Sequence, residues 1–405
     1  MGKEEYMNVE IAKSVYWTGK IDWELRRFHG EEYIAHRGSS YNSYLIKDQK
    51  NVLIDTVWQP FSSEFVCNLS ELIELNRIDF IVANHGEIDH SGALPELLRE
   101  IPDTPVYCTA NAVKSLKGQH HCDWNFQPVK TGDKISLGTR ELIFIEAPML
   151  HWPDSMFCYL TKNNILFSND AFGQHYATQY MYNDLADQQE LYDECIKYYA
   201  NILTPFNTFV KKKIEEILAM DLPLKMICPS HGVIWRDNPV QIVNKYLQWA
   251  QHYSENQITI VYDTMWNATR KIAESIAEGI FMEAPSLSLK IHNAARSDKT
   301  RIITDIFKSR GVLVGSSTIN RGILSAAGGI LEQIRGLSFK KKLAAAFCSY
   351  GWSGEAISII EDLLTKSGFE PLPRGPKILW YPDQNSRESC IEYGKSVARQ
   401  VLNYE

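Results

Sequence analysis

The sequence lacks the paired cysteines that would build a disulfide framework or a structural zinc ribbon. Its eight cysteines are scattered along 405 residues and form no C-x-x-C pair, which favours reduced thiols in a cytoplasmic protein. No apolar run approaches the roughly 18–20 residues that span a bilayer, and the N-terminal stretch has no apolar core of a secretory signal. The net charge of −7 is modest, so we expect neither nucleic acid nor a membrane as a partner.

Two nucleotide-binding motifs are missing as well. The sequence contains neither G-x-x-x-x-G-K-[S/T] nor G-x-G-x-x-G, which argues against a P-loop nucleotidase and a dinucleotide-binding fingerprint. Hydrophobic residues make up 44% of the chain and charged residues 22%, as in ordinary globular domains.

What the chain does contain is two halves with different patterns of strands and helices. In the first half, short apolar stretches predict strands, among them 79–84, 142–147, 165–169 and 225–229, with helices between them. This pattern favours an α/β sandwich with two sheets. From residue 256, strands and helices alternate strictly, which predicts a doubly wound, mainly parallel sheet. We therefore divide the chain at a polar stretch, into domains 1–254 and 255–405.

Residue types that bind metals recur just beyond the predicted strands of the first half. The stretch HGEIDH follows one strand, and HWPDS, FSND and PSHG follow three others. Because strand ends on one edge of a sandwich can converge, these loops could hold two metal ions, with the isolated acid Asp170 as a bridge. The predicted metal ligands are His85, Glu87, Asp89, His90, His151, Asp170 and His231.

Each of these motifs alone has an ordinary structural explanation. A lone histidine in SHG or LHW is more often a structural residue, and HGEIDH alone is equally compatible with a polar loop or helix cap. Their joint occurrence after four strands favours a metal site. By contrast, GQHHCD (118–123) follows no strong strand, and we interpret it as a surface loop.

Three loops of the second half are small, polar and placed after strands. They are YDTMWNATRK (262–271), SSTINRG (316–322) and SYGWSGE (349–355). A capped turn would explain the first loop alone, but all three belong to the edge where doubly wound sheets bind ligands. Hydroxyl and amide groups at a helix start suit a phosphate, and Tyr350 and Trp352 could cover a planar ring. This half resembles the flavodoxin fold that binds FMN, although Trp266-Asn267 stands where flavodoxins have Thr-Gly.

The first half resembles the metallo-β-lactamase fold, whose zinc hydrolases carry H-x-H-x-D-H. This sequence has H-x-E-x-D-H, and a carboxylate in place of an imidazole favours iron over zinc. Glu87 therefore indicates redox chemistry. Together the two halves resemble the flavodiiron proteins, also called A-type flavoproteins, over essentially the whole chain. Further motifs that carry the resemblance are DWELRRFHG, GSSYNSYL, FSNDAFGQH, YYANIL and HGVIWR.

The resemblance implies a role for each matching residue. His85, Glu87 and His151 would bind one iron, Asp89, His90 and His231 the other, and Asp170 would bridge them. In some members water displaces the histidine that matches His90. Three side chains would line the metal pocket or donate protons: His29, His175, and one of Tyr198 and Tyr199. The FMN-binding residues would be Thr264, Met265, Trp266, Asn267, Ala268, Thr269, Ser317, Thr318, Ile319, Asn320, Gly322, Ser349, Tyr350, Gly351, Trp352 and Ser353.

The resemblance also implies the activity. FMN would pass electrons to a di-iron centre that reduces O₂ to water, NO to N₂O, or both. The chain ends at residue 405 without the rubredoxin domain of flavorubredoxins, so we expect a separate donor, either rubredoxin or a reduced-cofactor oxidoreductase. This short form slightly favours O₂, with predominant NO reduction as the alternative. The family forms head-to-tail dimers or dimers of dimers. Two rival hypotheses are a zinc hydrolase with an accessory flavin domain, and a flavin module whose metal domain is degenerate.

Overall fold

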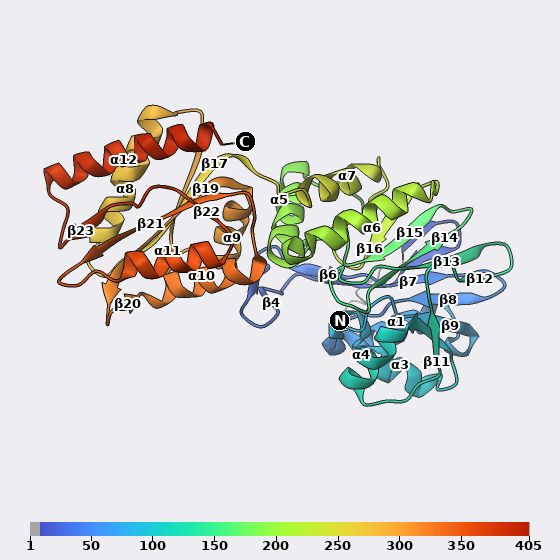
Figure 1. Ribbon diagram of the computed structural model, residues 1–405. Helices are drawn as coiled ribbons and strands as arrows, with labels where there is room; N and C mark the ends of the chain where they lie inside the picture. Colours follow the sequence, from blue (N-terminus) through green and yellow to red (C-terminus); the bar gives the residue numbers. More distant parts are fainter. Residues whose placement is uncertain (1–8, 405) are drawn as a thin grey trace. The chain divides into compact units, whose positions relative to one another are not determined.

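The computed structural model describes residues 9–404, which divide into two compact units (Figure 1). The first unit comprises the chain up to Phe28 together with Ala35–Tyr198 and Phe206–Leu247. The second comprises His29–Ile34, Tyr199–Pro205 and the chain from Gln248 onward. Two short segments of the first half are thus counted with the second unit, and a domain boundary between residues 254 and 255 stays a prediction. Within the described residues, no helix has the length and apolar character needed to cross a membrane.

The first unit is a sandwich of two sheets with helices outside, as predicted. One sheet contains β1 (Val9–Ala12), β2 (Val15–Trp17), β7 (Tyr44–Ile46), β8 (Asn51–Ile54), β9 (Ile78–Val82), β10 (Val106–Thr109) and β11 (Phe126–Val129), in that order. The other contains β12 (Lys134–Ser136), β13 (Glu141–Glu146), β14 (Met156–Leu160), β15 (Ile165–Asn169) and β16 (Met226–Pro229), in that order. Short strands β3 (Lys20–Asp22) and β6 (Ser39–Tyr41) form an additional pair.

The core of the first unit lies between its two sheets. Apolar side chains of both sheets share one cluster, for example Val82 of β9 and Phe144 of β13. A second cluster joins the outer face of the first sheet to helices, with Leu53 of β8 packed near Leu69 and Leu97. Burial of this apolar surface is the main driving force that holds the layers together. The helices of this unit include α1 (Ser62–Leu72), α3 (Leu94–Glu100), α4 (Ala110–His120), α5 (Gln188–Tyr198), α6 (Asn207–Ala219) and α7 (Val240–Trp249).

Three strands of the second sheet end at the same edge because they run in the same direction. Strand β15 is parallel to β16, and β14 is antiparallel to both β13 and β15, so β13, β15 and β16 run in the same direction. The loops that follow these three strands therefore leave the sheet at one edge.

The second unit is a doubly wound parallel sheet, as predicted. Its strand order is β18 (Ser288–Asn293), β17 (Glu255–Asp263), β19 (Ser309–Ile319), β21 (Leu343–Tyr350) and β22 (Glu370–Pro371). The chain order therefore reverses beside β17, which makes a switch point between β17 and β19. Two short strands, β20 (Gly322–Ile323) and β23 (Lys377–Leu379), pair with the ends of β19 and β21. The helices are α8 (Ala268–Glu283), α9 (Lys299–Lys308), α10 (Ser325–Leu337), α11 (Ala356–Lys366) and α12 (Gln384–Leu402).

Candidate metal centre and cofactor cavity

All seven predicted metal ligands lie directly after strands of the first unit. His85 and Glu87 follow β9, and Asp89 and His90 lie on the short helix α2 (Ile88–Ser91). The other three, on three further loops, are His151 after β13, Asp170 after β15 and His231 after β16. Six of these side chains are buried, and Glu87 is nearly so. Buried charges are costly unless they are paired or coordinate a metal, so their convergence demands an explanation.

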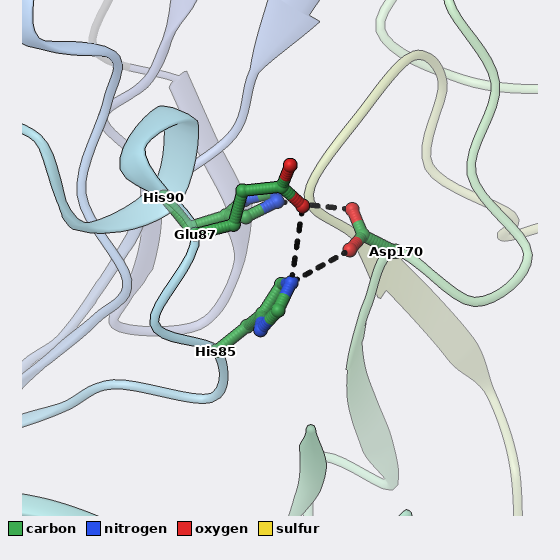
Figure 2. Close-up of side chains that lie close together, drawn as sticks. All are labelled: His85, Glu87, His90 and Asp170. Carbon is green, nitrogen blue, oxygen red and sulfur yellow. Dashed lines mark hydrogen bonds and ion pairs between the residues drawn. The ribbon is translucent and has the colours of Figure 1, made fainter. Parts of the chain in front are cut away.

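The seven side chains form two groups that share Asp170. Figure 2 shows His85, Glu87 and His90 around Asp170. Its Oδ2 atom lies 3.7 Å from His85 Nε2 and 3.4 Å from His151 Nε2. Its Oδ1 atom lies 3.0 Å from His90 Nε2 and 3.3 Å from His231 Nε2. One carboxylate thus presents a different oxygen to each group.

A second carboxylate belongs to each group. Glu87 Oε2 lies 3.2 Å from His85 Nε2 and 3.3 Å from His151 Nε2. Asp89 Oδ2 lies 3.4 Å from His90 Nε2 and 3.1 Å from His231 Nε2. Each group therefore offers two imidazoles, one carboxylate of its own and one oxygen of Asp170.

Several ligand atoms lack the hydrogen bonds that buried polar atoms normally make, although His85 Nε2 and Glu87 Oε2 lie within hydrogen-bonding distance of each other, at 3.2 Å. His90 Nε2 and both oxygens of Asp89 and of Asp170 are buried, yet none makes a hydrogen bond of acceptable geometry to the described residues. Ligand atoms of His85, Glu87, His90 and Asp170 lie within 4.8 Å of one another, as do those of Asp89, His90 and His231. Unsatisfied buried polar atoms are rare in native proteins. Two metal ions would satisfy them, so the donor set fits a dinuclear centre.

Outer contacts fix the orientation of two of the imidazoles. His85 Nδ1 donates to Asp154 Oδ1 at 2.8 Å, and the fully buried Asp154 also accepts from Gly86 N at 3.1 Å. His231 Nδ1 donates to the Ser40 carbonyl at 2.7 Å. In both residues Nε2 is left facing the centre with its lone pair, as a metal-binding imidazole requires. Our sequence reasoning missed Asp154, although it lies in the motif HWPDS that carries His151.

The electrostatics of the cluster favour positive charge. Burial alone would lower the pKa of each histidine, but nearby carboxylates outweigh it. Asp170 and Glu87 raise the pKa of His151 to about 9, and Asp170 and Asp89 raise that of His231 to about 10. Burial would raise the pKa of the Asp170 carboxyl, but the surrounding histidines, His90 first, hold it well below its usual range. Metal cations can supply this positive charge in place of protons.

Two of the predicted pocket residues pack against the metal centre. The His175 ring lies 4.8 Å from the His231 ring, and its Nδ1 is 2.8 Å from Ser39 Oγ. The Tyr198 ring lies 5.2 Å from His175 and 6.4 Å from His231. Burial, together with the carboxylates of the cluster, raises the pKa of the Tyr198 phenol well above its usual value, so this phenol keeps its proton at neutral pH.

The structure places the other two predicted pocket residues in the second unit. Tyr199 packs against Trp249 and Phe307, at ring distances of 5.4 and 5.8 Å. His29 lines a hollow together with Asn201 and other residues of that unit. The geometry therefore distinguishes Tyr198 from Tyr199 as the tyrosine beside the metal groups, and a role for His29 and Tyr199 there stays a prediction.

A cavity of about 600 Å³ lies at the carboxyl ends of the strands of the second unit. Eleven of the predicted FMN-binding residues line it, and three residues that we did not predict, Arg321, Trp380 and Tyr381, line it as well. The predicted ones are Met265, Trp266, Ala268, Ser317, Thr318, Asn320, Ser349, Tyr350, Gly351, Trp352 and Ser353. Arg321 could have been found, because it stands between the predicted Asn320 and Gly322.

The remaining predicted residues support the cavity from behind or border it. Thr269 Oγ1 is hydrogen-bonded to Ser317 Oγ at 2.9 Å and to Ser349 Oγ at 2.8 Å, so hydroxyls of all three loops meet. Asn267, with φ of 65°, begins α8 without capping it through its side chain. Thr264 Oγ1 is buried and has no hydrogen-bond partner among the described residues. Ile319 and Gly322 flank the β19–β20 turn.

These features fit a phosphate at the start of α8. A helix N-terminus presents free backbone N–H groups, and the helix dipole favours an anion there. The unpartnered hydroxyl of Thr264 is a further donor for phosphate oxygens. The aromatic and hydroxyl-bearing loops beside it offer the mixed lining that a planar, polar-edged ring requires.

Known protein families match each of the two units. A family described as "ODP family beta lactamase" matches residues 40–232, and the flavodoxin family matches residues 260–394. The anaerobic nitric oxide reductase flavorubredoxin of Escherichia coli O1:K1 / APEC is 54% identical over 396 residues, which cover 97% of this chain and 82% of that protein.

Two solved structures resemble the whole chain. The rubredoxin oxygen:oxidoreductase of Desulfovibrio gigas has a TM-score of 0.95 and 34% identity, over 98% of this chain and 99% of that one. The flavodiiron protein of Giardia intestinalis has a TM-score of 0.93 and 30% identity, over 100% and 98% of the two chains.

Proposed function

Because this chain belongs to the flavodiiron protein family, we propose that it is an oxidoreductase in which FMN passes electrons to a di-iron centre that reduces NO to N₂O and O₂ to water. The observation that carries the proposal is Asp170, whose two oxygens face two separate groups of ligands. A bridging carboxylate between two metal ions is characteristic of dinuclear redox centres.

His85, Glu87 and His151 would bind one iron, and Asp89, His90 and His231 the other. Support for His90 as a ligand is its Nε2 atom, which lies 3.0 Å from Asp170 Oδ1 and makes no hydrogen bond of acceptable geometry within residues 9–404. When bound, the iron pair supplies the electrons and the open coordination positions for a diatomic gas. Glu87 supports iron, because it makes the first group harder and more anionic than that of a zinc hydrolase.

The flavin site would divide into a phosphate part and a ring part. Thr264, Asn267, Ala268 and the N–H groups that open α8 would hold the phosphate. Met265, Trp266 and the loops 317–322 and 349–353 would surround the ring system, with Thr269 tying the loops together through its two hydroxyl contacts. When bound, FMN accepts and releases electrons.

Tyr198 and His175 would serve proton delivery at the metal centre, because both gas reductions consume protons. The Tyr198 phenol stays protonated at neutral pH, and the His175 ring packs against both the Tyr198 and the His231 ring. A general acid within reach of the reacting atoms contributes typically about 10²–10⁴-fold to a rate.

The mouth of the flavin cavity supports a head-to-tail homodimer, or a dimer of dimers, in which one subunit's flavin faces the partner's metal centre. Trp266 and Trp352, which line the cavity, are 86% and 87% exposed. Large exposed aromatic side chains grouped around a site mark an interaction surface. The electron donor would be rubredoxin, the protein named with the Desulfovibrio gigas relative, or a reduced-cofactor oxidoreductase. The cytoplasmic location also stays a prediction.

The gas preference is open to a direct test. The name of the Escherichia coli relative supports NO and that of the Desulfovibrio gigas relative supports O₂. We expect protein from iron-replete cells to contain iron and flavin. Protein that has been reduced under anaerobic conditions should consume NO in one stopped-flow run and O₂ in another. Reoxidation much faster with NO would favour the predominantly NO-reducing alternative. Zinc at both sites with hydrolytic activity would instead support the zinc hydrolase.

A further inference from the structure

A fourth segment of chain, Leu379–Tyr381, reaches the flavin cavity beside the three loops that the sequence predicts. It is brought there by β23, which pairs in parallel with the last residues of β21 (Figure 1). The register opposes Cys348 to Lys377 and Tyr350 to Leu379. Because parallel strands in register end at the same edge, the residues after β23 emerge beside the loop that follows Tyr350.

Trp380 is fastened to that loop by several contacts. Its backbone N–H donates to the Tyr350 carbonyl at 2.7 Å. A Cβ atom added at Gly351 would lie 3.0 Å from the Trp380 ring, so the indole packs directly against the glycine backbone. The neighbouring Lys377 holds the same loop, with Nζ 4.9 Å from the centre of the Tyr350 ring and 3.3 Å from the Ser353 carbonyl.

The backbone conformation of Trp380 is unusual and needs such fastening. Its φ of 58° lies in the left-handed region, which L-residues with large side chains rarely adopt. Residues held in such conformations cluster at ligand sites and persist only where their surroundings impose them. The contacts with the Tyr350 carbonyl and Gly351 impose this conformation, so the turn is held in place where it lines the cavity.

We propose that Trp380 and Tyr381 form a fourth wall of the flavin cavity and that Trp380 positions the Tyr350–Trp352 loop against the ring system of FMN. The two side chains line the cavity although they are 62% and 54% exposed, which leaves apolar faces open for a planar ligand. The phosphate part, at the start of α8, is formed by other residues. This inference rests on the proposed binding of FMN.

The test compares FMN with riboflavin, which has the same ring and no phosphate, on protein freed of flavin and refilled. Trp380→Ala should raise the dissociation constants of FMN and riboflavin by the same factor, about tenfold, because an aromatic contact is worth on the order of that ratio. Thr264→Val should weaken FMN alone. Phe281→Ala, which removes another exposed aromatic ring of the same unit, 66% exposed and not lining the cavity, should change neither constant.

A second measurement guards against general unfolding. Gly351→Ala should weaken flavin binding a few-fold in the natural chain, because its new Cβ would lie 3.0 Å from the Trp380 ring and displace it, and much less in a chain that also carries Trp380→Ala. Trp380→Phe should retain most of the affinity. Two results would contradict a role of Trp380 in the flavin cavity: equal flavin dissociation constants for Trp380→Ala and the natural chain, or additive effects of Gly351→Ala and Trp380→Ala. Either result would leave the proposed function intact. Failure of the natural chain to bind FMN would overturn the proposed function itself.

Discussion

The metal centre and the flavin cavity differ in how far the groups that would bind the cofactor are buried. At the metal centre the donor atoms are buried or nearly so and form two sets, in each of which ligand atoms lie within 4.8 Å of one another, and Asp154 and the Ser40 carbonyl hold two imidazoles in place. At the flavin cavity the backbone and hydroxyl contacts are buried, but the aromatic rim is open. A metal ion needs ligands fixed before it arrives, whereas a large organic cofactor can itself order and cover apolar side chains. The difference predicts that substitutions at one site leave the other cofactor in place.

The largest expected effect follows the loss of the bridge. Asp170→Asn keeps the shape of the side chain but removes the charge that both ligand groups share, so iron should fall from about two ions per chain to less than one, and gas reduction by at least about 100-fold. Metal analysis, flavin absorbance and N₂O production check this. Full iron content and unchanged gas reduction in this variant would show that Asp170 is not the bridging ligand.

The next effect is expected at Asp154, which is not a predicted metal ligand but holds one of them, His85. Asp154→Asn should lower the affinity of the first ligand group for iron by about 10–100-fold, because the amide no longer holds His85 as an anion does. Iron chelation rates at a fixed chelator concentration measure the change. The Asp133→Asn variant is a control, since that carboxylate is half-buried in a surface turn of the same unit, where it accepts from Lys130 N, and its chelation rate should match that of the natural chain.

A change of ligand type should alter which metal is held. Glu87→His restores the H-x-H-x-D-H pattern of zinc hydrolases, and we expect the zinc-to-iron ratio of protein grown with both metals to rise about tenfold. Elemental analysis of parallel cultures gives the ratio. An unchanged ratio would show that Glu87 does not select the metal.

The smallest effect is expected at the phosphate end of the flavin cavity. Thr264→Val removes one hydroxyl that is buried without a partner among the described residues, so FMN affinity should fall about tenfold, the lower end of what one hydrogen bond to a charged group is worth. Iron content should be unchanged. A loss of iron in this variant would contradict the independence of the two sites.

Much of the fold and of the metal centre could be predicted, because each ligand follows a strand. His85, Asp170 and His231 each come directly after an apolar run, and strand direction alone brings such loops to one edge. The same reasoning could not tell which of Tyr198 and Tyr199 lies beside the metal centre. A π-helical segment, Tyr199–Leu203, begins between them and breaks the helical spacing on which such a choice depends.

The residues that were missed are positioned by long-range contacts. Asp154 reaches His85 across the sandwich, from a loop 69 positions away in the sequence. Trp380 and Tyr381 reach the flavin cavity through the pairing of a three-residue strand, β23, with β21. Such a short strand has little hydrophobic pattern of its own, and its register is decided by tertiary packing that no local motif records.

The central claim is that electrons pass from the flavin to the gas through iron. It is tested most directly by reducing the protein anaerobically, mixing it with NO or O₂, and following flavin reoxidation in iron-loaded and in zinc-loaded samples of equal flavin content. We expect rapid reoxidation of the iron-loaded protein by either gas, and reoxidation by NO at least about 100-fold slower with zinc, which has no redox chemistry. Equal rates with NO in the two samples would contradict electron transfer through iron.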